Sequence, residues 1–168
     1  MKKFVTGFIM LVLMMITSVA FAYKPYPTHL GDDSNFVLCD GHMGTAWYVD
    51  RSSLVVQKYA PPQYIIAVNV VTVDRADEGN TDVASVKTYR FFYNYDLRKM
   101  YVDYNGGSNW HYLDPQGSWA ETGIRMPAGE IAFAIAYNLK FYGGQSWYNE
   151  FLHRSTVVFK DDFYDRLR

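Results

Sequence analysis

The sequence predicts an α+β fold in which an antiparallel meander sheet of about six or seven strands packs against a C-terminal helix, with a short helical tail. Three observations lead to this prediction. Short β-like runs separated by turn residues continue from position 36 to position 113. An apolar helical pattern follows Met126-Pro127, and aromatic residues, which favour half-buried pleated surfaces, make up 18% of the chain.

The first predicted strands are short and alternate with turns. Strands are expected at 36–40, 46–50 and 54–59, and turns are expected at 40–44 and 50–53. Pro61 and Pro62 follow, and the last run ends there because proline donates no hydrogen bond to a sheet.

The clearest strand lies at 64–74, which is apolar on both faces apart from Asn69. Such a strand belongs in the centre of a sheet, covered on both sides. The acidic segment 75–82 is expected to form a solvated hairpin loop. In the next strand, 85–95, alternate residues share a face, so one face is an aromatic ladder of Tyr89, Phe91, Tyr93 and Tyr95 and the other holds Thr88, Arg90, Phe92 and Asn94.

Tight turns close the predicted sheet. Asp96-Leu97-Arg98 and the segment 105–109 are expected to reverse the chain before strands at 99–104 and 110–113. Asp114-Pro115-Gln116-Gly117 is typical of a β-turn, because proline stands second and glycine fourth. The sheet is expected to end here.

A helix is predicted to begin at Met126-Pro127 and to cover 129–142, with Gly143-Gly144 ending it. Its aliphatic residues form one arc, and Phe133, Tyr137 and Phe141 form an aromatic stripe on the opposite side. A helix with two apolar sides needs two partners. The sheet is one, and the other is either the tail 146–168 or a second subunit, for which these three aromatic residues are the predicted self-association face.

In the tail, Trp147 with Phe151 and Tyr148 with Leu152 stand one helical turn apart behind Ser146, a candidate helix cap. We therefore expect a helix there and a second short helix over 161–167, whereas 156–159 fits either a strand or a helix.

The first 22 residues have the pattern of a cleaved secretory signal peptide. Lys2 and Lys3 precede an apolar run, and Ala20-Phe21-Ala22 supplies small residues before the expected cleavage point. Cleavage leaves an extended segment at 23–35 and a single α+β domain at 36–168, which is periplasmic, associated with the cell surface or secreted. An uncleaved anchor is the alternative, although the proline-containing segment 23–27 disfavours a helix that continues onward.

Charge and cysteine content exclude several classes of function. Removing Lys2 and Lys3 changes the formal net charge from −1 to −3, and the sequence shows no basic face for nucleic acid or an anionic membrane. The single cysteine, Cys39, permits no intrachain disulfide. We expect it to be a small buried hydrophobe, the alternatives being an interchain disulfide or a reactive thiol.

No catalytic site is predicted, so we expect no enzymatic activity, no cofactor and no metal. Cys39 and His42 flank an expected turn, but a Cys/His nucleophile also needs an orienting group that the sequence does not identify. The chain has no G-x-S-x-G, H-E-x-x-H or phosphate-loop motif. His29, Asp32 and Asp33 offer metal ligands but are better explained as a solvated segment.

The best candidate for recognition is the glycine-containing segment 105–109 with the aromatic residues after it. We assign Trp110, Tyr112 and Trp119 as ligand-binding residues of one surface, since their rings can stack on sugars or grip a peptide. Packing of both tryptophans in the core is the alternative.

Four segments carry a family resemblance: 47–54, 64–74, 87–95 and the helix at 129–142. With them the chain resembles the surface-adhesin protein E family of small exported Gram-negative proteins. The resemblance implies an antiparallel sheet backed by a C-terminal helix, frequent self-association and, for some members, adhesion to host proteins. Two features depart from the family: the mature N-terminus lacks a lipid-attachment cysteine, and the tail after Gly144 is longer than expected.

Together these observations favour an exported, non-catalytic binding or adhesion module of a Gram-negative-type cell envelope, which contacts a protein or glycan of the host or the envelope. The alternative is a structural or interaction protein of the periplasm or envelope that forms homo-oligomers through its helix. A third reading is a cell-wall glycan-binding or glycan-acting protein. Neither nucleic acid nor a membrane span after processing is expected.

Overall fold

The structure is a computed structural model that describes residues 26–150 and 152–168. The predicted signal peptide at 1–22 lies outside these residues. Within them, no helix combines the length and the apolar character that crossing a membrane requires.

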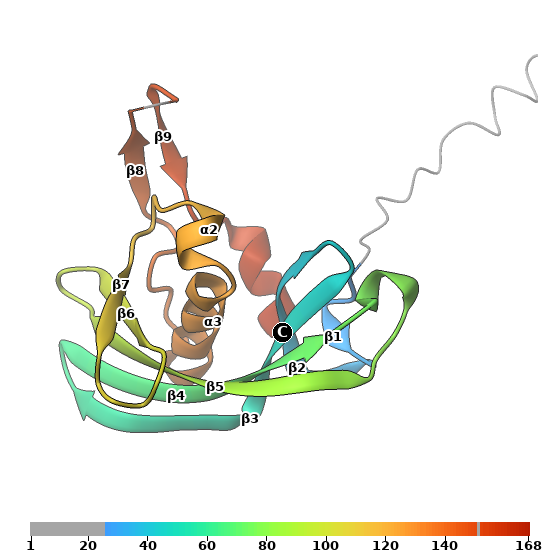
Figure 1. Cartoon of the computed structure of the whole chain (residues 1–168). Coiled ribbons are helices and arrows are strands. Elements are labelled where there is room, and N and C mark those ends of the chain that lie inside the picture. The colour runs from blue at the N-terminus through green and yellow to red at the C-terminus, as the bar shows by residue number, and fades with distance from the viewer. Residues whose placement is uncertain (1–25, 151) are drawn as a thin grey trace, which may run out of the picture.

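Seven antiparallel strands form one sheet in the order of the chain, which confirms the predicted α+β meander (Figure 1). Because three strands lie on each side of β4, the central position predicted for 64–74 is also confirmed. The predicted cover on both faces is only partly correct, because Val71 and Val73 are buried on the face away from the main core but Ile65 on the same face is partly exposed. Part of the segment 23–35 joins the sheet. The strands are β1 His29–Leu30, β2 Asp33–His42, β3 Thr45–Ala60, β4 Gln63–Val73, β5 Val83–Asn94, β6 Lys99–Asp103 and β7 Trp110–Leu113.

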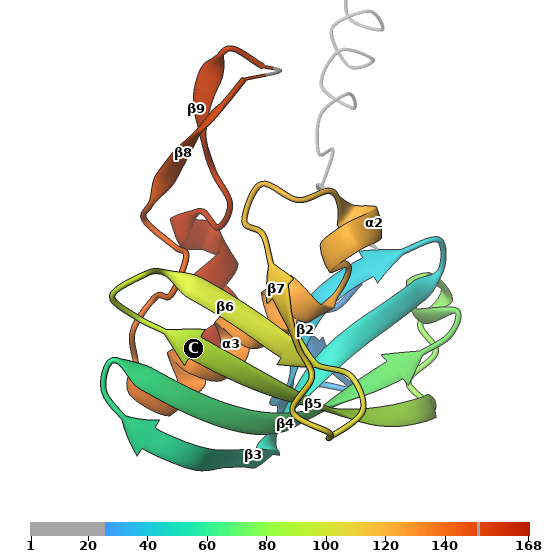
Figure 2. The same cartoon turned by 60° about the vertical axis from the view of Figure 1, so that its left-hand side comes forward.

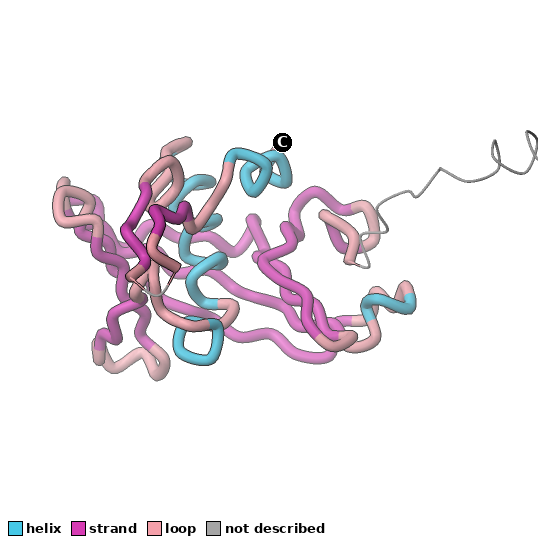
Figure 3. Tube along the Cα trace, turned by 90° about the horizontal axis from the view of Figure 1, so that it is seen from above, coloured by secondary structure: helices cyan, strands magenta, loops and turns pink. Residues whose placement is uncertain are grey.

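The helix α3 (Arg125–Tyr137) lies over one face of this sheet (Figures 1 and 3). We call that face the helix side and the opposite face the outer face. The short helix α2 (Trp119–Thr122) precedes α3, the 3-10 helix η2 (Asp161–Leu167) packs against it, and the 3-10 turn η1 (Ala76–Glu78) lies between β4 and β5. No described helix covers the outer face of β5 to β7 (Figure 2), whereas at the C-terminal end of β4 the outward-facing Val71 and Val73 are buried in a second cluster with Ala76 of η1.

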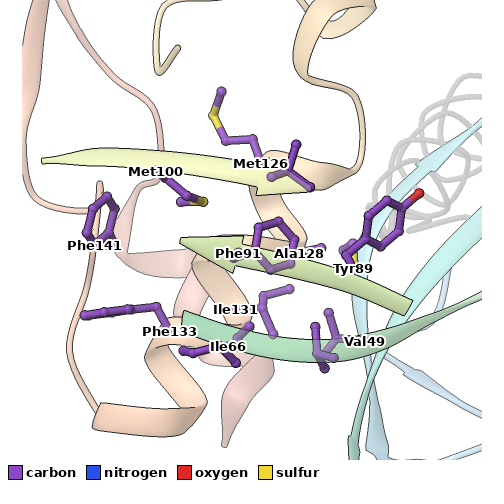
Figure 4. Packing of buried hydrophobic residues seen from close by; sticks show 14 of the residues in the cluster. Val49, Ile66, Tyr89, Phe91, Met100, Met126, Ala128, Ile131, Phe133 and Phe141 are labelled. Carbon is purple, nitrogen blue, oxygen red and sulfur yellow. The ribbon is translucent and has the colours of Figure 1, made fainter. Parts of the chain in front are cut away.

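The main core lies between α3 and the sheet. Ile131 and Phe133 of the helix, Ile66 of β4 and Phe91 of β5 belong to one cluster, and all four side chains are fully buried (Figure 4). Tyr89, Phe91 and Tyr93 point toward the helix because alternate residues of β5 share one face, which confirms the aromatic ladder. No residue of α3 is exposed, since η2 and the preceding loop cover its second side.

The prediction that Gly143-Gly144 ends the helix is wrong. Asn138 ends α3 by adopting the left-handed conformation, with φ 53°. The chain then turns back, and the N–H groups of Phe141 and Tyr142 each donate to the buried carboxylate of Glu130 at 2.8 Å. The buried Glu130 carboxylate therefore accepts hydrogen bonds from two backbone N–H groups that were expected to bond within further turns of the helix.

The prediction of a helix behind Ser146 is also wrong. The segment is a hairpin of β8 (Ser146–Asn149) and β9 (Arg154–Val157) that projects from the body (Figures 1 and 2). Its base is held by Trp147, whose ring centroid lies 5.7 Å from that of Tyr142. The short helix expected over 161–167 is confirmed as η2.

Two breaks predicted in the first half of the sheet are smaller than expected. The turn at 40–44 is confined to Met43-Gly44. At 50–53 the strand does not end: β3 continues through an irregularity between Asp50 and Val55, where Asp50 Oδ1 accepts the N–H of Ser52 at 3.0 Å. The Asp50 carboxylate thus binds backbone within a bulge, so that β3 continues on both sides of residues that have no partner in β4.

Candidate functional site

The outer face carries a row of large side chains, one from each of four neighbouring strands. Ile65 of β4 pairs with Phe92 of β5, Phe92 with Tyr101 of β6, and Tyr101 with Tyr112 of β7. We call these four residues the outer row. The ring centroids are 5.6 Å apart for Phe92 and Tyr101 and 5.5 Å apart for Tyr101 and Tyr112, so the rings are in contact.

The outer row is open to solvent. Tyr112 is 45% exposed, and the other three side chains are partly buried. Trp110 adds a further ring, 5.8 Å from that of Phe92, at the next register position of β7. Contiguous, partly exposed rings of this kind are typical of recognition surfaces, because each brings large contact area with little rotamer entropy to lose.

Strand alternation explains why these rings face outward. Since Phe91 and Tyr93 point to the helix, Phe92 between them points away. The sequence places Phe92 on that face, but the prediction missed Tyr101 as a site residue. The length of the turn between β5 and β6 could have indicated that Tyr101 lies opposite Phe92, because the turn of a hairpin fixes the register of its two strands.

Beside the outer row, four groups contact the guanidinium of Arg90, one of which is the Gly106 carbonyl that accepts from Nη1 at 3.3 Å. The same Nη1 donates to Asp103 Oδ2 at 2.8 Å, and the Arg90 Nε donates to Gln57 Oε1 at 2.9 Å. The guanidinium also lies over the Trp110 ring, 5.3 Å from the centroid. The side chain keeps 24% of its surface exposed, so it borders the row as a fixed cation that a ligand can reach.

Asp103 fixes the loop between β6 and β7. Its carboxylate accepts the backbone N–H groups of Asn105 and Gly106 at 3.1 Å and of Ser108 at 2.9 Å. Burial raises the pKa of Asp103, but these N–H groups and Arg90 outweigh burial, so the pKa lies below its usual value. The ionised carboxylate therefore holds this loop next to Trp110.

The charged side chains in and around the outer row are mainly cations. Lys99 lies 5.9 Å from the ring centroid of Tyr112. Lys58 pairs with Ile65 across the strands, and its Nζ donates to Gln63 Oε1 at 3.0 Å. With Arg90 there are three cations, against two acidic groups: Asp103, and the exposed Asp114, whose charge adds to the effect of burial in raising the pKa of Tyr112. This part of the surface is therefore locally positive in a chain of net charge −1.

The structure brings two of the three predicted ligand-binding residues together and separates the third. Trp110 and Tyr112 both lie on the outer face. Trp119 lies on the helix side, where its Nε1 donates to Asp40 Oδ2 at 2.7 Å and its ring centroid is 5.1 Å from that of His42. The expectation of one surface formed by 105–110 and Trp119 is therefore wrong, because the sheet stands between them.

The predicted self-association face lies largely in the interior. Phe133 and Phe141 are fully buried, and both rings pack on Tyr93, with centroid distances of 4.9 and 5.2 Å. Tyr137 is partly buried, 4.9 Å from the ring of Tyr64. Two of the three residues are thus occupied by the core of their own chain, and the helix finds its second partner in the tail rather than requiring another subunit.

The remaining chemical candidates are dispersed. Cys39 is free and 4% exposed, which confirms the predicted buried hydrophobe, and burial raises the pKa of its thiol and so disfavours the reactive thiolate. His42 stacks on Trp119, and His29 Nε2 lies 3.0 Å from the Arg166 carbonyl oxygen. Among residues 26–150 and 152–168, no three His, Cys, Asp or Glu side chains gather to hold a metal ion.

A surface hollow of about 780 Å³ lies between the C-terminal end of α3 and η2. Charged groups line it, and several of them are paired within the chain: Lys140 Nζ donates to Asp161 Oδ1 at 2.6 Å, and the Arg51 guanidinium donates to the Leu167 carbonyl, although its buried Nε has no hydrogen-bond partner. The hydrogen bond from Lys140 lowers the pKa of Asp161. These internal pairs make the hollow a weaker candidate than the outer row.

Comparison with protein-family models found no match to this chain, and comparisons with curated proteins and with solved structures found none either. The resemblance to the surface-adhesin protein E family therefore stays a prediction.

Proposed function

We propose that the chain is an exported, non-catalytic binding or adhesion module that contacts a protein or glycan of the host or the cell envelope through its outer face. The observation that carries this proposal is the outer row, with adjoining aromatic side chains from β5, β6 and β7 and no described helix over them. Export is inferred from the sequence of residues 1–22.

The physical reason is the cost of exposing aromatic rings in water. Burying them against a partner gains roughly 25 cal/mol for each Å² of apolar surface, so a contiguous set provides binding energy that isolated exposed rings do not. The rings are already ordered by cross-strand contacts, which lowers the entropy lost on binding.

The test measures binding of the purified processed chain to arrays of matrix proteins, glycans and peptidoglycan. The double variant Tyr101→Ala with Tyr112→Ala is compared with Tyr148→Ala, which removes a tyrosine that is 59% exposed on the β8–β9 hairpin. We expect saturable binding by the wild type, a loss of at least about tenfold in the double variant, equal to 1.4 kcal/mol, and little change in the control.

Two outcomes contradict the proposal. One is the absence of binding to every class of component on the arrays. The other is a double variant that stays folded and binds as tightly as the wild type. Recovery of the intact leader on a cytosolic form, by mass spectrometry of fractionated cells, contradicts export in particular.

A second candidate is a structural or interaction protein of the envelope that assembles with itself. The structure favours the projecting hairpin over the helix as its contact, since Tyr148 and Val157 are 59% and 42% exposed on one face of the hairpin. An isolated two-stranded hairpin is marginal in water, so a partner along it adds stability. Sedimentation at micromolar concentration tests this candidate, and a monomer that captures no envelope protein contradicts it.

A further inference from the structure

The position of the outer row limits how a ligand is recognised. Its three inner strands, β4, β5 and β6, each pair with a neighbour on both sides, so their backbone offers no free edge to a peptide strand. A ligand that lies across these strands therefore meets side chains, above all the rings of Phe92, Tyr101, Tyr112 and the neighbouring Trp110, and only β7, at the edge of the sheet, has a neighbour on one side alone.

Sugar rings suit a surface of this kind. A pyranose has a face of C–H groups, which packs on the electron-rich face of an aromatic ring, and a rim of hydroxyl groups, which need polar partners. On the outer face, Gln57 and Arg90 lie at one side of the row and Lys99 lies beside Tyr112. Since neighbouring strands are about 4.8 Å apart, the row presents its contacts at regular intervals to a chain that crosses the strands.

The charge of this surface selects among glycans. Lys58 of β3 stands at one end of the cross-strand row, next to Ile65. Arg90, partly neutralised by Asp103, and Lys99, near the exposed Asp114, flank the row on its two sides along the strands, which leaves three cations against two acidic groups. The cations are exposed or partly exposed, whereas Asp103 is 2% exposed and fully engaged by its own loop. A ligand thus meets positive charge, and a chain with carboxylate or sulfate groups is complementary to it.

We infer that the outer row binds an acidic glycan chain, a polysaccharide with carboxylate or sulfate groups, laid across strands β4 to β7. The aromatic rings stack on its sugar faces, while Lys58, Arg90 and Lys99 meet its acidic groups. This inference rests on the proposed function and names the ligand class of the same face.

The test measures, by calorimetry, the affinity of the processed chain for three probes: a polygalacturonate oligosaccharide, a heparin-derived oligosaccharide and a neutral cello-oligosaccharide. We expect at least one acidic probe to bind at least about tenfold more tightly than the neutral probe, and added salt to weaken that binding. Tyr101→Ala with Tyr112→Ala should remove the binding, and Lys99→Gln should weaken it severalfold. The matched control is Lys87→Gln, an exposed lysine on the helix side of β5 that lies over Tyr89.

Several results overturn the inference. Equal affinity for the neutral probe shows that charge does not select the ligand, and equal losses in Lys99→Gln and Lys87→Gln show attraction to overall charge rather than to this face. If neither acidic probe binds, but a matrix protein binds and is lost in the tyrosine variant, the ligand is a protein. The acidic-glycan inference then fails while the proposed binding module stands.

Discussion

At the scale of single residues, Asp103 connects stability with the candidate site. It is buried at the end of β6, accepts three backbone N–H groups from the following loop and pairs with Arg90, which lies over Trp110. The same carboxylate therefore orders the loop and positions the cation beside the outer row. Its isosteric amide retains one acceptor oxygen, so it cannot satisfy all of these donors.

We expect Asp103→Asn to lower the free energy of unfolding by about 1–3 kcal/mol near neutral pH, because buried donors lose their acceptor. The pKa of Asp103 is lower in the folded chain than in the unfolded chain, so its stabilising contribution is present above the unfolded pKa of about 3.9 and is lost as the pH falls through the folded value. Urea titrations from pH 7 to pH 2 check this expectation.

The difference between wild type and Asp103→Asn should therefore shrink below about pH 4. A matched control is Asp96→Asn in the turn before β6, where the side chain is exposed. A difference that is constant with pH, or a control that behaves like Asp103→Asn, contradicts the role given to Asp103.

At the scale of elements, the approach of α3 to the sheet depends on Gly129. A Cβ atom there would overlap the sulfur of Met100 and lie 3.0 Å from Phe91 Cδ1. The Gly129 carbonyl also accepts the hydroxyl of Tyr93 at 2.8 Å. The absence of a side chain lets the helix backbone sit directly on the aromatic ladder of β5, and the ladder fixes which residues of β5 face outward.

We expect Gly129→Ala to destabilise the chain by about 1–3 kcal/mol, because overpacking outweighs the roughly 1 kcal/mol that alanine gains in helix propensity. Gly107→Ala is the control, since a Cβ at Gly107 meets nothing within 4 Å. Thermal and urea unfolding measure both variants. A Gly129→Ala protein as stable as the wild type contradicts the close packing of α3 on β5.

Elements with a single dominant pattern could be predicted from sequence, and those with competing patterns could not. The apolar run that became β4 and the alternation in β5 admit one interpretation each. In the tail, Tyr148 and Leu152 have helical spacing, yet pairing of β8 with β9 places the tail in a hairpin. The helix end was mispredicted because Gly143-Gly144 is the stronger local signal, whereas Asn138 takes the left-handed conformation and Glu130 binds the returning chain.

At the scale of the whole molecule, the site is a product of register. The sequence identified Trp110 and Tyr112, and Phe92 was placed on the correct face. Only the register of β5, β6 and β7 shows that Tyr101 lies between Phe92 and Tyr112 in one row. Trp119 could not be separated from this set by sequence, because its position depends on a hydrogen bond to Asp40, a residue distant in the chain.

The two faces of the sheet thus differ in what covers them. The helix side contains the main core, where α3, η2 and the returning chain bury Phe133 and Phe141, two of the three residues predicted for self-association, and a smaller second core lies on the other face beside β1 and η1. No described helix lies over the outer face of β5 to β7 (Figures 1 and 2), where Tyr112 and Lys99 are exposed and Phe92 and Tyr101 are partly exposed. A rigid sheet that presents ordered side chains suits recognition, because these side chains lose little conformational entropy when a ligand binds.

The most direct measurement is a nuclear magnetic resonance titration of the isotope-labelled processed chain with the component that binds it most tightly in the array experiment. If the outer face is the binding surface, the largest amide shifts will centre on Phe92, Tyr101 and Tyr112, with little change in α3 or the β8–β9 hairpin. Shifts centred on the hairpin or on the helix side, with the outer row unperturbed, would contradict it.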